Sequence, residues 1–358
     1  MRLFFPALAA GLALCAVTGF ARQTAVSDGP YHVQKTAKVG GEGGFDYVYA
    51  DSDGRRLYVA RSGPAPRVAA FNLDTLAPVG EIPQTNARGA AADTMTHHAF
   101  ASSSPVAMWD TKTMTLIKTI PVEGRPDGIL SDSYNHRVYI FSHSAPNVTV
   151  LDAKDGAILG TIDLGGAPEQ AASDGKGHLY VDVEDKDTVA VIDAKTMKVT
   201  AQYSLNGKGG GNAGLALDAK NHVLFVACRN PQTMVMLDAN DGKYLADLPI
   251  GRGCDGAVFN PKTGECFSSQ GDGTLTVIKE KSPTSFVVEQ TVTTMSGAKT
   301  LTLDSKTGKI LLIAAEYAPA PPPVTPAPGA PPPAEGRGNR GGRRPMLPGS
   351  FSIVVVGK

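Results

Sequence analysis

Short runs of alternating apolar and polar residues follow one another along most of the chain. The unit is clearest between Gly165 and Asp193: a strand of small residues over 169–173, a turn over 174–177, and the runs LYVDV and TVAVID. The next run, AKTMKVTAQYSL, supplies a fourth strand. Alternation with a period of two, interrupted by Gly and Asp in turns, is typical of antiparallel strands joined by hairpins. The pattern predicts an all-β protein.

This four-strand unit recurs along the chain. When the copies are aligned on the residue before each small-residue strand, the aligned positions are 39 to 44 residues apart. These positions are Asp46, Arg88, Asp127, Glu169, Ala213, Asp255 and Lys299. A period near forty residues with about four short strands per copy indicates a β-propeller blade. The seven copies therefore predict a seven-bladed β-propeller.

One strand stands outside the repeat. The segment over 31–39, YHVQKTAKV, has no hairpin before it, whereas the last repeat, with ILLIAAE and SFSIVVVG, lacks a fourth strand. We expect the N-terminal strand to complete the last blade and close the ring without a covalent bond. Such closure removes an exposed strand edge, which would otherwise favour aggregation.

Residues 1–21 have the pattern of a secretory signal peptide. An arginine precedes an apolar run over 3–17, and the small residues Gly19 and Ala21 follow at the spacing of a cleavage site. The run is shorter than the ~20 apolar residues that span a bilayer. We therefore expect one propeller over 22–358 in the periplasm or outside the cell, as a monomer with no transmembrane segment after signal removal.

A proline-, glycine- and arginine-rich segment over 317–349 interrupts the last repeat. Such composition favours extended and flexible conformations, so we predict a disordered, solvated loop. Its arginines form a basic patch, which would suit an anionic polymer or single-stranded nucleic acid. They are Arg337, Arg340, Arg343 and Arg344.

Charge and cysteine content add modest constraints. Lys plus Arg and Asp plus Glu both number 34, so the net charge of zero implies no general attraction to nucleic acid or anionic membranes. Cys228 and Cys254 are expected on the same face of neighbouring blades. An oxidising compartment would allow a disulfide between them; the alternative is that they and Cys266 are three buried thiols.

The topology predicts a ligand site at one mouth of the central channel. In a four-strand meander the start of the first strand and the end of the second lie on the same face, so the aligned residues should surround the mouth. Arg61, His143, Glu184, Arg229 and Glu316 end the second strands nearby. We assign ligand binding to Asp46, Arg88, Asp127, Glu169, Asp255, Lys299, His143, Glu184 and Arg229.

A mouth of mixed charge suits a polar ligand, although ion pairs that serve only structure produce similar clusters. Clustered carboxylates are also typical of Ca²⁺ sites, but the interleaved Arg and Lys residues disfavour a cation. Apart from a possible Ca²⁺ ion we expect no cofactor.

Motifs for catalysis are lacking in the sequence. Gly209, Gly211 and Gly214 match the GxGxxG spacing, but no helix is predicted after them, so the context for binding a dinucleotide is missing. The sequence contains no nucleophile elbow, P-loop or haem-attachment motif. We assign no catalytic residue.

The phrases LYVA and VIDAKT, and the Pro126-Asp127-Gly128 start of a first strand, resemble the YVTN-repeat propellers of the YncE-like family. The resemblance covers essentially the whole mature chain. It implies an exported propeller and leaves the biochemistry open, because one fold serves many functions. One family member binds single-stranded DNA, but no motif here carries that property to particular residues.

Three functions follow from these observations. The first is an exported, non-enzymatic propeller that binds a polar ligand or a macromolecular partner at the channel mouth. The alternative is a metal-dependent, lactonase-like propeller hydrolase. A further alternative is binding of single-stranded nucleic acid or another polyanion through the arginine-rich loop.

Overall fold

The computed structural model describes residues 28–319 and 344–358. Within these ranges the chain forms seven sheets of four strands each, with antiparallel pairing throughout. The one helical element of the described residues is a short 3-10 turn, η1 (Glu184–Lys186). This architecture confirms the all-β, seven-bladed propeller that the repeat predicts. The expected signal peptide and Arg337, Arg340 and Arg343 lie outside the described residues.

The first four sheets follow the chain order, from the strand nearest the axis to the strand at the rim. The first blade comprises β2 (Phe45–Asp51), β3 (Arg56–Arg61), β4 (Arg67–Asn72) and β5 (Pro78–Pro83). The second comprises β6 (Ala90–Asp93), β7 (His98–Ala101), β8 (Val106–Asp110) and β9 (Leu116–Ile120). The third comprises β10 (Pro126–Asp132), β11 (Arg137–Ser142), β12 (Val148–Asp152) and β13 (Ile158–Ile162). The fourth comprises β14 (Pro168–Ser173), β15 (His178–Val183), β16 (Thr188–Asp193) and β17 (Lys198–Ser204).

The remaining three sheets complete the ring, and the last combines both ends of the described chain. The fifth blade comprises β18 (Asn212–Asp218), β19 (Val223–Cys228), β20 (Thr233–Asp238) and β21 (Tyr244–Pro249). The sixth comprises β22 (Cys254–Asn260), β23 (Glu265–Gln270), β24 (Thr274–Ser282) and β25 (Ser285–Thr293). The seventh comprises β26 (Leu301–Asp304), β27 (Lys309–Ala314), β28 (Ser352–Gly357) and β1 (His32–Lys38).

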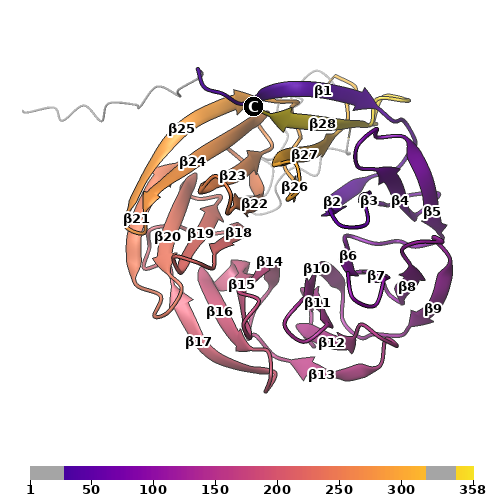
Figure 1. Cartoon of the computed structure of the whole chain (residues 1–358), viewed down its shortest axis with the longest axis horizontal. Helices are drawn as coiled ribbons and strands as arrows, with labels where there is room; N and C mark the ends of the chain where they lie inside the picture. Colours follow the sequence, from indigo (N-terminus) through magenta and orange to yellow (C-terminus); the bar gives the residue numbers. More distant parts are fainter. Residues whose placement is uncertain (1–27, 320–343) are drawn as a thin grey trace, which may run out of the picture.

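Figure 1 shows the blades arranged around a central axis, with the first strand of each blade innermost. The middle strands are the most buried, because neighbouring blades cover both of their faces. In β19, for example, all six residues are buried. The rim strand β17 instead alternates between exposed and half-buried residues. This difference explains why continuous apolar runs mark the middle strands and alternating runs mark the rim.

The core lies between adjacent blades. Tyr58 of the first blade contacts Trp109 of the second edge to face, with their ring centroids 5.5 Å apart. Both side chains are fully buried, and small residues such as Ala92 complete the same cluster. This interface is therefore filled by large aromatic residues of the middle strands together with small residues of the innermost strand.

The N-terminal strand β1 pairs antiparallel with β28 and forms the outer edge of the seventh sheet. Tyr31, immediately before β1, is attached to the sixth blade. Its backbone N–H donates to Oε1 of Gln290 at 2.9 Å, and Nε2 of Gln290 donates to its carbonyl at 2.7 Å. The Tyr31 hydroxyl donates to Glu265. The segment over 31–38 thus connects the sixth and seventh blades.

The described ends of the segment over 317–349 pair with each other. Tyr317 forms a bridge with Met346, and the backbone N–H of Ala318 donates to the carbonyl of Pro345 at 3.0 Å. These contacts extend the hairpin of β27 and β28 by a few residues.

Within residues 28–319 and 344–358, no helix has the length and hydropathy of a membrane span.

Candidate functional site

The aligned residues occupy equivalent places at the start of the innermost strands. Asp46, Asp127, Glu169, Ala213 and Asp255 are each the second residue of their strand. Arg88 and Lys299 each lie two residues before theirs. Three further charged residues follow the second strand of a blade directly: His143, Glu184 and Arg229. These side chains come together in a network of ion pairs, which we call the mouth cluster.

One half of the mouth cluster consists of paired opposite charges. Arg229 contacts both Glu184 and Asp255, and Lys299 contacts Asp255 as well. These contacts join the fourth, fifth, sixth and seventh blades. Burial acts to lower the pKa of Lys299, but the Asp255 carboxylate outweighs it and raises that pKa. Both cations therefore remain charged at neutral pH.

Arg88 and Asp46 form a similar contact between the first two blades. Nη1 of Arg88 donates to Oδ2 of Asp46 at 3.0 Å. Burial raises the pKa of Asp46, and the positive charges of Lys299 and Arg88 oppose that rise. Asp46 is thus paired with a cation of the second blade and also feels the positive charge of Lys299 in the seventh.

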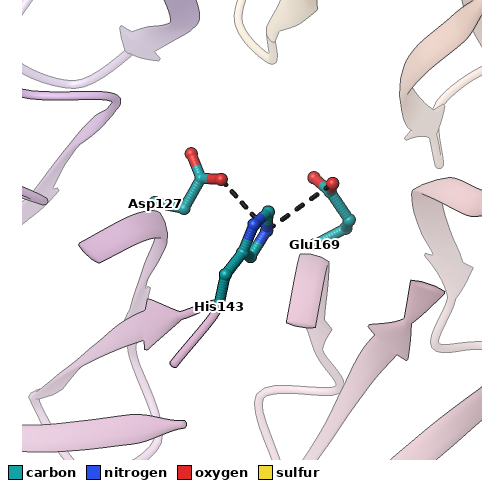
Figure 2. Close-up of side chains that lie close together, drawn as sticks. All are labelled: Asp127, His143 and Glu169. Atoms are coloured by element: carbon teal, nitrogen blue, oxygen red, sulfur yellow. Dashed lines mark ion pairs between the residues drawn. The ribbon is translucent and has the colours of Figure 1, made fainter. Parts of the chain in front are cut away.

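The other half of the mouth cluster is different, because it combines two carboxylates with an imidazole. Nε2 of His143 lies 3.0 Å from Oδ2 of Asp127 and 3.6 Å from Oε1 of Glu169. Figure 2 shows the imidazole between the two carboxyl groups, with Asp127 and His143 from the third blade and Glu169 from the fourth. One ligating atom from each residue lies within 4.8 Å of the other two.

Burial and like charges shift the protonation of these carboxyl groups. Burial raises the pKa of Glu169 to about 9, and the carboxylates of Glu184, Asp127 and Asp255 contribute to the rise. Burial and the Asp46 carboxylate raise the pKa of Asp127, against the opposing effect of His143 and Arg88. Glu169 therefore holds a proton at neutral pH when no cation is bound beside it.

A close approach of two strands makes this arrangement possible. Gly128 follows Asp127, and a Cβ atom at residue 128 would lie 2.7 Å from the carbonyl oxygen of Glu169. Such a separation is too short for any side chain. Glycine at this position lets β10 approach β14 closely enough to bring the two carboxyl groups together.

Two residues at this end of the channel were missed by the sequence analysis. The Tyr47 hydroxyl, from the first blade, donates to Oε2 of Glu169 in the fourth at 3.0 Å. Oε1 of Gln170 accepts from the backbone N–H groups of Leu215 and Ala257, and Nε2 donates to the carbonyl of Ala257. Both side chains therefore reach across the channel to other blades.

The channel beside these residues contains a cavity of about 220 Å³. Tyr47, Glu169 and Gln170 are among its lining residues, together with small and apolar side chains of the innermost strands. The volume is below the roughly 300–1,000 Å³ of pockets for drug-sized ligands. The space suits a small polar molecule or an ion.

The structure places several expected residues outside the mouth cluster. Arg61 is buried; its guanidinium donates to the carbonyls over 40–43 and lies 3.7 Å from the centroid of the Phe351 ring. Glu316 pairs with Lys38 at 3.0 Å. The expectation that Arg61 and Glu316 lie beside the aligned residues at the channel mouth is therefore wrong. Ala213 is one of the aligned residues but carries no polar group.

Three cysteines lie in the described part of the chain, and all are buried free thiols: Cys228, Cys254 and Cys266. The disulfide between Cys228 and Cys254 is thus not formed there. Burial raises the pKa of the Cys254 thiol to about 12 and that of Cys228 further, so both stay protonated at neutral pH. Neither thiol has the exposed, electropositive setting of a reactive cysteine.

Comparisons with known proteins support the fold. No protein-family model matches the chain, and no curated protein matches it. Among solved structures, a chain in a crystal structure of the mitotic checkpoint complex is similar, with a TM-score of 0.68 and 12% sequence identity. The match covers 87% of this chain and 95% of that one. At this identity the likeness concerns the fold alone: the chain is a seven-bladed β-propeller.

Proposed function

We propose that the protein is a non-enzymatic binding protein that takes a small polar ligand at the mouth cluster. The observation that carries this proposal is the convergence of charged side chains from all seven blades at one end of the channel, beside a cavity of about 220 Å³. Ion pairs of this kind hold donors and acceptors in fixed positions, which favours ligands with several hydrogen-bonding groups.

The charges of the mouth cluster restrict the ligand further. Five carboxyl groups and three permanent cations face this end of the channel: Asp46, Asp127, Glu169, Glu184 and Asp255 against Arg88, Arg229 and Lys299. Even with Glu169 protonated, four carboxyl groups face three cations, so a strongly anionic molecule would not be favoured. We therefore propose a neutral or cationic ligand that presents hydroxyl or amine groups.

A thermal-shift screen tests this function. Sugars, amino acids, polyamines and organic acids would be added to the full chain, and stabilising compounds retested on Arg229→Gln and Lys299→Gln. We expect at least one neutral or cationic compound to raise the melting temperature, with affinity reduced tenfold or more in both variants. Glu81→Gln, in an ion pair at the rim with Arg67, is the matched control. Equal shifts in all variants would contradict binding at the mouth.

We also propose that the protein is exported and related to the YncE-like propellers, on the strength of the residues 1–21 and the recurrent repeat phrases. Fractionation of the native host, with detection of the processed N-terminus, tests export. An unprocessed protein in the cytoplasm would exclude it.

The second candidate, a metal-dependent hydrolase, is favoured by one specific observation: the two carboxylates and the imidazole of Asp127, Glu169 and His143. This function requires that the metal-loaded protein hydrolyse a lactone and that Asp127→Asn abolish the hydrolysis. Unchanged hydrolysis in that variant would reject the mouth cluster as the catalytic site.

A further inference from the structure

Asp127, His143 and Glu169 bring three ligating atoms to one point at the channel mouth. The three atoms are a carboxylate oxygen of each acid and Nε2 of the imidazole, all within 4.8 Å of one another (Figure 2). They come from two adjacent blades, so the fold itself, rather than one local motif, assembles the group. We call these residues the triad.

The two separations from the imidazole nitrogen match the coordination shell of a small divalent metal ion. Bonds of about 2.1 Å to a common centre place neighbouring ligands about 3.0 Å apart in an octahedron and about 3.4 Å apart in a tetrahedron. The observed distances from Nε2 of His143 are 3.0 Å to Asp127 and 3.6 Å to Glu169. An ion can therefore sit between the three atoms with small rotamer adjustments.

Within the described ranges, the imidazole nitrogen of the triad also lacks a hydrogen-bond partner. Nε2 of His143 has almost no accessible surface and no aligned hydrogen-bond partner, although it lies between two carboxyl oxygens. An unsatisfied buried polar atom costs roughly 1–3 kcal/mol. A bound metal ion would accept the lone pair of this nitrogen and remove that cost.

Neighbouring cations do not neutralise the triad carboxyl groups. Arg229 and Lys299 contact Asp255, and Arg88 contacts Asp46. Among the residues that the structure describes, neither Asp127 nor Glu169 forms an ion pair with Arg or Lys. Both carboxyl groups thus remain available as ligands at the point where the three ligating atoms meet.

We propose that Asp127, His143 and Glu169 bind one first-row divalent transition-metal ion, with Zn²⁺ the preferred occupant. Imidazole nitrogen is a ligand for such ions, whereas Ca²⁺ takes six to eight oxygen ligands. Three protein ligands leave at least one coordination position for water or for a ligand oxygen. This inference rests on the proposed binding function, because the metal would occupy part of the same mouth.

Metal analysis and titration test the triad directly. The full chain would be stripped with a chelator, titrated calorimetrically with Zn²⁺, Mn²⁺ and Ca²⁺, and its Co²⁺ form examined by visible absorption. We expect one Zn²⁺ per chain, binding at least 100-fold tighter than Ca²⁺. Asp127→Asn, His143→Gln and Glu169→Gln should each weaken Zn²⁺ binding tenfold or more and alter the Co²⁺ spectrum.

A matched control comes from His178, which lies 2.9 Å from the Asp174 carboxylate on the surface and, within residues 28–319 and 344–358, belongs to no group of three candidate ligands. His178→Gln should bind Zn²⁺ as the unmodified chain does. Circular dichroism identifies any variant that fails to fold, and the other two triad variants then decide. Absence of stoichiometric Zn²⁺ binding, or folded triad variants that retain it, would overturn the proposal.

The same material separates this inference from the proposed function. If no Zn²⁺ binds while stabilising ligands still depend on Arg229, the mouth binds a ligand and the metal site is wrong. If Zn²⁺ binds but no ligand responds to Arg229→Gln, the metal site stands and the ligand site at the mouth is wrong.

Discussion

The guanidinium group of Arg55 in the first blade donates hydrogen bonds of 2.9 and 3.0 Å to the two carboxylate oxygens of Asp304 in the seventh blade. Asp304 is buried, whereas Arg55 is partly exposed and also pairs with Asp74. Two-point contacts of this kind are stronger and more directional than single hydrogen bonds. This pair joins the blades where the ring closes.

Arg55→Ala should therefore destabilise the propeller strongly. The change leaves the buried Asp304 carboxylate without its cation, which costs about 3 kcal/mol or more. Urea denaturation measures the loss. Arg125→Ala, at an exposed arginine at the start of the third blade, is the control and should change stability by less than about 0.5 kcal/mol.

The same pair predicts sensitivity to acid. Burial acts to raise the pKa of Asp304, but hydrogen bonds from Arg55 and Thr307 lower it to about 2. Because this value lies below the roughly 3.9 of an unfolded aspartate, the contribution is fully present above about pH 4. It is lost as the pH falls towards 2. Unfolding monitored between pH 5 and pH 2 should show a smaller decline for Arg55→Ala than for the unmodified chain.

Glu280 predicts the opposite dependence. Burial raises its pKa to about 7; the neighbouring Asp218 contributes to the rise, and a hydrogen bond from Asn221 opposes it. The folded state then binds the proton more tightly than the unfolded state, whose glutamate titrates near 4.3. Stability from this residue is present below about pH 4 and is lost as the pH rises through 7. Glu280→Gln should remove a decline on the order of 2 kcal/mol between pH 5 and pH 8; an unchanged decline would contradict the assignment.

Gln170 offers a test of packing inside the channel. Its amide forms hydrogen bonds of 2.9 to 3.0 Å with the backbone of Leu215 and Ala257, in the fifth and sixth blades. Gln170→Ala leaves these backbone groups without partners and should lower the free energy of unfolding by about 2 kcal/mol. Gln202→Ala, which removes a single 3.3 Å bond to Leu164, should cost clearly less in the same denaturation experiment.

Removal of the N-terminal strand tests ring closure. A chain starting after residue 38 exposes the edge of β28, whose six residues are all buried. We expect aggregation or loss of cooperative unfolding, because an unpaired apolar strand edge pairs with other chains. Light scattering compares this chain with one starting at residue 28. A monomeric, cooperatively folded chain without β1 would show that closure is dispensable.

The sequence predicted the blades well because every blade repeats the same hydrophobic pattern. The expected strand TVAVID coincides with β16, Thr188–Asp193, and the small-residue strand over 169–173 lies within β14. The repeat also located the start of each innermost strand. These features depend on local patterning, which a single chain displays directly.

Tyr47 and Gln170 could not be predicted because strand register decides their direction. The pairing register shifts between Phe45 and Val48 in the first blade and between Pro168 and Ala171 in the fourth. Such bulges re-aim side chains, so consecutive residues no longer alternate strictly between the faces. The sequence contains no signal for the position of these shifts.

The error on Arg61 has a related cause. Arg61 is the last residue of β3, whereas Arg229 is the first residue after β19. A displacement of one position along a strand turns a side chain to the opposite face. Arg61 therefore points into the protein against Phe351, while Arg229 reaches the mouth.

The pairing of β1 with β28 has one more consequence. His32 lies opposite Gly357, so the two ends of the described chain are neighbours on one edge. A short peptide linker could join them without disturbing any blade, and new termini could then be opened in another connection between blades. The propeller is thus a cyclic arrangement: the order of the blades around the axis matters, but which blade comes first in the chain does not.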